Sequence, residues 1–179
     1  MSRKIFIDAG AYNGDSIDAF RKMRSDADEF EIYAFEPNPA YKIELDAKDV
    51  IVIEKAVWIE DGYVDFYIGE HDGTGSTLIK GKTSGEVNYK APQQTLGVDF
   101  NNWIKETFDP NDYIIVKMDI EGAEFEVIPH MMEGESILYI SQLWCEFHPN
   151  KLPQYTTKDK TSLIKKIKAY EHLLFKDWH

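Results

Sequence analysis

Short apolar runs alternate along this chain with longer amphipathic segments, and this alternation constrains the fold more than any other feature. The first runs cover 4–8, 31–36 and 50–57, and helical patterns at 16–24 and 38–47 separate them. Strands that alternate with amphipathic helices pair in parallel, and the helices cover both faces of the sheet. The pattern therefore predicts a doubly wound α/β domain with a mostly parallel sheet.

The rhythm breaks near residue 60 and then resumes. The turn sequence Glu60-Asp61-Gly62 and an alternating strand at 63–68 predict a hairpin, followed by a polar loop at 71–77. Downstream we expect a helix at 99–107, a strand at 113–118, a helix from Gly122 that ends or kinks by Ile128 because of Pro129, a strand at 137–147, a basic helix at 158–170 and a final run at 172–178. With no internal repeat and no linker, we expect one domain over residues 1–179.

Composition and charge exclude several classes of protein. The hydrophobic fraction is 43%, so a folded core is expected, and the single cysteine, Cys145, excludes a disulfide framework. The net charge of −12 opposes binding to nucleic acid. No apolar stretch reaches the roughly 18–20 residues of a membrane helix, and the first apolar run stops at Asp8. We therefore expect no membrane span, no export signal and a cytoplasmic location.

One segment reverses the overall charge. Residues 151–168 hold six lysines against one aspartate. Either this is a solvated helix face, or it is a docking patch for an anionic partner or substrate.

The strongest local signal is the segment from Ile5 to Ser16, a strand that enters a glycine turn and then a helix. Ligands of doubly wound sheets bind at such turns. Tyr12 stands where the dinucleotide fingerprint has its second glycine, and Asp8 and Asp15 disfavour a diphosphate but favour a cationic sulfonium. The turn therefore suits S-adenosylmethionine, with predicted cofactor-binding residues Asp8, Gly10, Ala11, Tyr12, Asn13, Gly14 and Ser16.

Residues at the ends of the next two strands extend this predicted cofactor site. Glu36 stands where a carboxylate accepts hydrogen bonds from ribose hydroxyls, and Pro37 stiffens the exit. The alternative is an acid that only flanks the next helix. Ala56 and Val57 end the third strand, where an adenine ring would lie, and the alternative for both is ordinary core.

Three sequence blocks together resemble the FkbM family of S-adenosylmethionine-dependent class I methyltransferases. They are Asp8-x-Gly10-Ala11-x-x-Gly14-x-Ser16, Ala34-Phe35-Glu36-Pro37 and, most specifically, Lys117-Met118-Asp119-Ile120-Glu121-Gly122-Ala123-Glu124. Ala56-Val57, Gly75-Ser76-Thr77-Leu78 and Glu146-Phe147-His148 follow in the family's order. The resemblance implies a Rossmann-like fold and methyl transfer to a hydroxyl, often on a sugar or glycan.

The chain departs from the family pattern at both ends. Family members commonly have helices before the first strand, and this fold usually finishes with an antiparallel hairpin, for which there is room here for only one strand. We therefore expect a sheet shortened at both ends, a more open pocket and an exposed edge that favours a homo-oligomer. A shortened but capped sheet is the alternative.

A hydroxyl is a weak nucleophile, so the transfer calls for a base or a metal at the ends of the fourth and fifth strands. Glu146 and His148 are two positions apart and point to the same side of an extended segment. We predict His148 as the base, Glu146 beside it and Asp119 at the junction of methyl donor and acceptor. The alternatives are a histidine that only caps the strand end and an aspartate that only caps a helix.

Other polar residues near these motifs have two interpretations each. Glu121 and Glu124 hold the cofactor's ammonium group or sugar hydroxyls, or they only complement a helix dipole. Ser76 and Thr77 close over the acceptor, or they only fill a polar loop. A divalent metal on Asp119, Glu146 and His148 ranks second to base catalysis. No motif includes the remaining histidines, His71, His130, His172 and His179.

The leading hypothesis is therefore an O-methyltransferase that acts on a small-molecule or glycan hydroxyl. Its rival from another class is a non-catalytic scaffold or docking module that keeps the cofactor pocket. A nucleotide-dependent oxidoreductase is a third hypothesis, and Tyr12 and the acidic turn argue against it.

Overall fold

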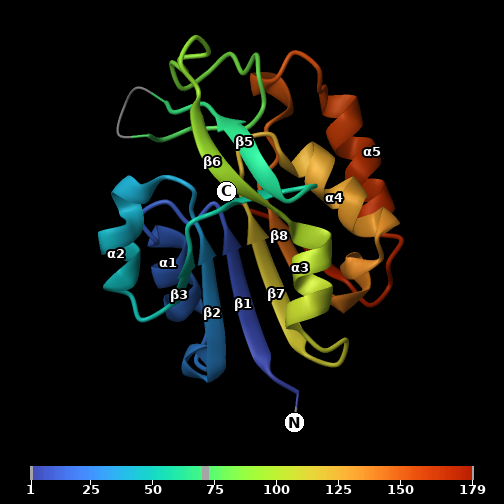
Figure 1. The fold of residues 1–179 in the computed structure, drawn as a ribbon. Helices are drawn as coiled ribbons and strands as arrows, with labels where there is room; N and C mark the ends of the chain where they lie inside the picture. Colours follow the sequence, from blue (N-terminus) through green and yellow to red (C-terminus); the bar gives the residue numbers. More distant parts are fainter. Residues whose placement is uncertain (1, 70–72, 179) are drawn as a thin grey trace.

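The computed structural model describes residues 2–69 and 73–178, which form two β-sheets and five α-helices (Figure 1). The larger sheet has the order β3-β2-β1-β7-β8-β9, and all its neighbouring strands are parallel. Its strands are β1 (Lys4–Ala9), β2 (Phe30–Phe35), β3 (Ile51–Ile53), β7 (Tyr113–Met118), β8 (Ile140–Cys145) and β9 (Leu174–Asp177). The helices are α1 (Asp15–Met23), α2 (Lys42–Asp46), α3 (Phe100–Thr107), α4 (Glu124–Glu133) and α5 (Thr157–Ile167).

Alternation along the strands divides the core into two layers. Phe6 of β1 faces α1, where its ring stacks on Phe20 at 3.9 Å between centroids. Its neighbours Ile5 and Ile7 face the opposite side and join the core that includes residues of α3, α4 and α5. In Figure 1, α1 and α2 accordingly lie on one side of the sheet and α3, α4 and α5 on the other. The predicted doubly wound α/β fold is confirmed.

A smaller sheet corrects the prediction of one strand over 50–57. That segment forms β3 and then β4 (Ala56–Trp58), which belongs to a second sheet with the order β4-β6-β5. Between them the backbone turns tightly, because the Lys55 N–H donates to the Ile53 carbonyl at 2.8 Å. Ala56 and Val57 therefore do not end the third strand of the large sheet. They begin the small one.

The predicted hairpin after Glu60-Asp61-Gly62 is also wrong. β5 (Gly62–Phe66) does not pair with the strand before it, because β6 (Gln93–Asp99) lies between β4 and β5. β6 pairs in parallel with β4 and antiparallel with β5. No strand was expected over β6, whose first three residues are polar.

Two predicted boundaries in the second half shift as well. Helix α4 does not end at Ile128 but runs through Pro129 to Glu133, since Val127, Ile128 and Met131 are fully buried and packing holds both sides of the proline. The predicted strand over 137–147 starts only at Ile140, after a 3₁₀ helix at Ser136–Tyr139.

The large sheet has β3 at one edge and β9 at the other. β9 is the single strand that the final run provides, and it adds in parallel to β8 with Leu174 57% exposed. Self-association through this edge stays a prediction. Within the described part of the chain, no helix combines the length and the apolar character that crossing a membrane requires.

Gly10 should be essential for the turn after β1. An added Cβ would lie 2.0 Å from the Asp119 carbonyl oxygen, and the backbone has a φ of +82°. We expect Gly10→Ala to lower the free energy of unfolding by about 3–5 kcal/mol in urea denaturation. The matched control is Gly62→Ala, because Gly62 also has a positive φ, +129°, but no atom within 4 Å of the added Cβ. Equal losses in the two variants would contradict the clash.

Candidate functional site

A buried lysine organises the carboxyl ends of β1 and β7. Lys117 Nζ lies 3.1 Å from Asp8 Oδ1 and 3.8 Å from Asp119 Oδ2, and it donates to the Gly10 carbonyl at 2.9 Å. Burial disfavours the ammonium form, but Asp8, Asp119 and Glu36 outweigh burial and raise the pKa of Lys117. The charged lysine therefore ties the glycine turn to the acidic segment after β7.

Asp8 has a different environment from the one its sequence position suggested. It is fully buried, and its carboxylate pairs with Lys117 and accepts a hydrogen bond from the Ser16 hydroxyl. Its charge is thus directed into the protein and not toward a ligand. Asp8 and Ser16 therefore stabilise the glycine turn through contacts inside the protein.

The glycine turn also holds Glu36 in place. The Gly10 and Ala11 N–H groups donate to the Phe35 carbonyl at 3.1 and 3.0 Å. Glu36 accepts hydrogen bonds from the N–H of Tyr12, at 2.9 Å, and from that of Asn38, at 2.8 Å, one on each carboxylate oxygen. Since an ionised carboxylate has about four acceptor positions, both oxygens keep capacity for another donor. Burial raises the pKa of Glu36 despite these bonds.

A cavity lies at these strand ends and brings part of the predicted cofactor site together. Among the predicted residues, those that line it are Gly10, Tyr12, Glu36, Pro37, Ala56, Val57 and Glu121, and Asp119 joins them. The predicted residues that do not line it are Asp8, Ala11, Asn13, Gly14 and Ser16. Ala56 and Val57 reach the cavity from the small sheet, so their position was expected although their strand was not.

His148 lies in a ring of four carboxylates. Its Nδ1 lies 3.0 Å from Glu124 Oε1, which also accepts from the His148 backbone N–H at 3.0 Å. Its Nε2 faces Glu146 Oε1 at 3.3 Å, and Asp119 Oδ1 and Glu121 Oε2 at 3.7 Å each. Burial disfavours the imidazolium, but Glu124, Glu121 and Asp119 raise the pKa of His148 above its usual value. The role of His148 as the base stays a prediction.

Glu124 holds His148 and does not line the cavity. It is fully buried, and its second oxygen accepts from the Gly122 N–H at 2.8 Å. Glu124 is the first residue of α4, so the predicted alternative of an acid in the first helical turn fits its position. It orients the imidazole.

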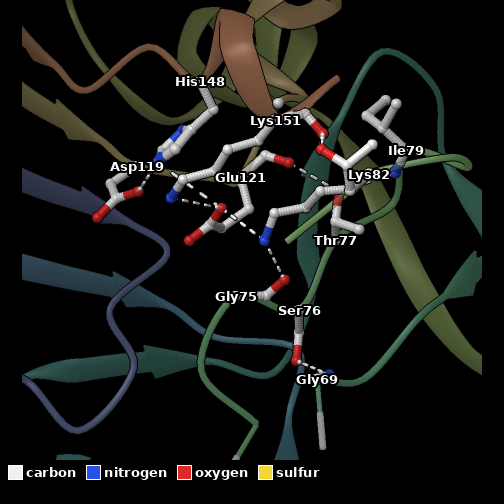
Figure 2. A network of polar contacts seen from close by, with 12 residues as sticks. Gly69, Gly75, Ser76, Thr77, Ile79, Lys82, Asp119, Glu121, His148 and Lys151 are labelled. Atoms are coloured by element: carbon white, nitrogen blue, oxygen red, sulfur yellow. Dashed lines mark hydrogen bonds and ion pairs between the residues drawn. The ribbon is translucent and has the colours of Figure 1, made fainter. Parts of the chain in front are cut away.

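Glu121 connects this ring to the loop at 73–78, which lines the cavity and is called the roof loop below (Figure 2). Its carboxylate pairs with Lys82 at 2.7 Å and with Lys151 at 3.6 Å, and its carbonyl accepts from the Thr77 hydroxyl at 2.8 Å. Burial raises the pKa of Glu121, but His148, Lys82 and Lys151 together lower it below its usual value. Glu121 also has a φ of +53°, so these contacts hold an uncommon backbone conformation.

The roof loop has more structure than its polar sequence predicted. Thr77 is fully buried and pairs with Tyr67 in a β-bridge, and Ser76 donates to the Gly73 carbonyl. Lys82, almost fully buried, donates to the Gly75 carbonyl and so ties the loop to Glu121. His71, Asp72 and His179 lie outside the described residues.

The two lysines are the site residues that sequence reasoning missed. Lys117 belongs to the most specific motif but was given no role, although it interrupts the apolar run from Tyr113 to Met118. A charged residue inside a buried strand was the available signal. Lys82 has no comparable signal, because its neighbours read as an ordinary polar loop.

The fold and the site place the chain in a structural class, the Rossmann-like, doubly wound domains, with its cavity at the carboxyl ends of β1, β2 and β7. Residues 8–171 match the family model described as the methyltransferase FkbM domain. The chain therefore belongs to the FkbM methyltransferase family, and the resemblance seen in its motifs is confirmed.

A solved structure supports the fold. The crystal structure of methyltransferase FkbM from Methylobacillus flagellatus KT resembles this chain with a TM-score of 0.55 at 16% sequence identity. The similarity covers 94% of this chain but only 37% of the other, so this chain spans little more than a third of that protein's length. Among curated proteins, no sequence matches the chain.

The Lys117 ion pair should contribute strongly to stability. Lys117→Met leaves the buried Asp8 carboxyl group without its cation and with Ser16 as its main partner, so we expect a loss of about 3–5 kcal/mol in the free energy of unfolding, measured in urea. The double variant Asp8→Asn/Lys117→Met removes both charges and should recover part of the loss.

Lys22→Met, at an exposed position of α1, serves as the control and should change stability by less than about 0.5 kcal/mol. A double variant no more stable than Lys117→Met would show that the unpaired Asp8 charge is not the cause.

Proposed function

We propose that this chain is an S-adenosylmethionine-dependent O-methyltransferase whose acceptor is a hydroxyl of a sugar or glycan. The observation that carries the proposal is that the cavity adjoins His148 and its four carboxylates, called the acid–histidine ring below. Asp119 and Glu121 belong to both the cavity and this ring. A methyl donor in the cavity would thus meet an acceptor held at the ring.

The cavity suits the cofactor at several points. Glu36 keeps acceptor capacity for ribose hydroxyls, and Ala56 and Val57 offer an apolar wall for an adenine ring. Tyr12 stands where a diphosphate site needs glycine for close approach of the backbone, and its ring packs on Tyr41 with centroids 4.3 Å apart. Asp119 supplies negative charge for a sulfonium, and Glu121, which also lines the cavity, offers a carboxylate acceptor for the ammonium group.

The acid–histidine ring suits the acceptor. In the transfer, the methyl leaves sulfur as an acceptor oxygen attacks it in line, and that oxygen loses its proton. We assign Asp119, Glu146 and His148 to hold the hydroxyl and take up this proton. Carboxylates that are 29% and 33% exposed at their side chains, as in Asp119 and Glu146, can accept hydrogen bonds from neighbouring sugar hydroxyls.

Ligand binding can be tested by thermal unfolding with S-adenosylmethionine, S-adenosylhomocysteine and NAD. A ligand at 100 times its dissociation constant adds about 2.7 kcal/mol of stability, so both adenosyl ligands should raise the melting temperature and NAD should not. Glu36→Gln should weaken binding by roughly tenfold or more, since it loses a charged acceptor, whereas Glu44→Gln, exposed on α2, should not.

Catalysis separates the enzyme from a scaffold with the same fold. Methyl transfer to a panel of sugars and glycans should be lost in Glu146→Gln, which changes a residue outside the cofactor cavity, and retained in Glu133→Gln, exposed at the end of α4. Cofactor binding without transfer to any acceptor would favour a docking module. A melting temperature unchanged by both adenosyl ligands would refute the proposed cofactor.

A further inference from the structure

A buried nitrogen faces the ring without a hydrogen bond. The His148 side chain is 2% exposed, and its Nε2 lies 3.3–3.7 Å from three carboxylate oxygens. Among the described residues, none makes a hydrogen bond to this nitrogen. Nε2 is therefore a polar atom aimed into the ring, with three carboxylates around it.

The other ring nitrogen is fixed in the way that metal-binding histidines usually are. Nδ1 lies 3.0 Å from a fully buried carboxylate, that of Glu124, which also accepts from the His148 backbone. A carboxylate at this place keeps a proton on Nδ1, so a metal ion that displaces the proton of the imidazolium would meet the Nε2 lone pair on the side of the ring. Glu124 thus prepares Nε2 as a ligand.

Lysines divide the carboxylates of the ring into two groups. Glu121 is paired with Lys82 at 2.7 Å and with Lys151 at 3.6 Å, so its charge is already matched. No ion pair joins Glu146 to a lysine of the described chain, and Asp119 meets Lys117 only at 3.8 Å, through the oxygen that points away from His148. The carboxylates left for a cation are those of Asp119 and Glu146.

The spacing of these three groups suits one ion. Ligand atoms at about 2.1 Å from a metal, at angles near 90–110°, are about 3.0–3.5 Å apart, and opposite ligands about 4.2 Å. Nε2 and Glu146 Oε1 are 3.3 Å apart, Nε2 and Asp119 Oδ1 are 3.7 Å apart, and the candidate ligand atoms of all three residues lie within 4.8 Å of one another. A rotation of the two partly exposed carboxylates would bring these atoms to coordination distance from one ion.

We propose that Asp119, Glu146 and His148 Nε2 bind a divalent cation that accepts both imidazole and carboxylate ligands, such as Mn²⁺. One imidazole and two carboxylates form a mixed donor set that suits such an ion, and three ligands leave coordination positions open. Of the three residues, Asp119 lines the cavity and connects the proposed metal site to it, and His148 is the buried ligand.

The role of the cation rests on the proposed function. An acceptor hydroxyl in an open position would have a lowered pKa, and its proton would pass to water or to a carboxylate of the ring. The oxygen would then form its bond to the methyl carbon as the carbon–sulfur bond breaks, leaving neutral S-adenosylhomocysteine. The cation would thus narrow the proposed function: with His148 as a ligand, the acceptor proton would go to a carboxylate or to water and not to the imidazole.

Direct binding of Mn²⁺ tests the site without any acceptor or cofactor. The whole chain, treated with chelator and dialysed, is titrated with Mn²⁺ while electron paramagnetic resonance measures the free ion. We expect one ion per chain and a loss of affinity of roughly tenfold or more in both Asp119→Asn and Glu146→Gln. Glu133→Gln, an exposed carboxylate outside the ring, should bind as the unaltered chain does.

The outcomes separate this inference from the proposed function. The metal site is overturned if Mn²⁺ shows no saturable binding at millimolar concentration, or if binding is unchanged in both Asp119→Asn and Glu146→Gln. Either result holds whatever thermal unfolding with S-adenosylmethionine shows. Binding lost in the ring variants upholds the site even when the cofactor test fails. Methyl transfer that continues at full rate in chelator overturns the cation's part in the reaction, and transfer restored by Mn²⁺ supports it.

Discussion

Lys117 is the contact on which the site depends. It is buried at the centre of the sheet, where β1 and β7 end side by side, and it meets Asp8, the Gly10 carbonyl and Asp119. A buried charge is tolerated only when it is paired and hydrogen-bonded, so the motifs of these two strands must occur together. The glycine turn and the acidic segment are consequently one structural unit, although more than 100 positions separate them in the sequence.

Acidic residues of the site divide by burial into two kinds. Asp8 and Glu124 are fully buried and hold Lys117 and His148 in place. Asp119 and Glu146 are partly exposed and face the space where chemistry is proposed. Because the buried acids fix Lys117 and His148, the geometry around the two partly exposed acids is set before any ligand arrives.

The sequence predicted best those parts where local pattern and packing agree. The strand at 113–118 and the helix after the first turn were placed to within a residue or two, because apolar periodicity reports burial directly. The break between β3 and β4 was missed, since Glu54-Lys55 carries no glycine or proline to signal a turn. The meeting of Asp119, Glu146 and His148 was predicted from parallel strand ends, whereas the contacts of Asp8 and Lys82 depend on tertiary packing that no local pattern encodes.

The order of strands in the large sheet also bears on how the chain reaches this structure. β1 lies between β2 and β7, and Lys4 is beside Tyr113, more than half the chain away. During synthesis, β1 can pair with β2 early, but its other edge stays open until β7 emerges from the ribosome. Contacts this distant in sequence make folding slow and leave apolar strands exposed meanwhile. Production of this protein should therefore respond more to chaperones and low temperature than its final stability alone would suggest.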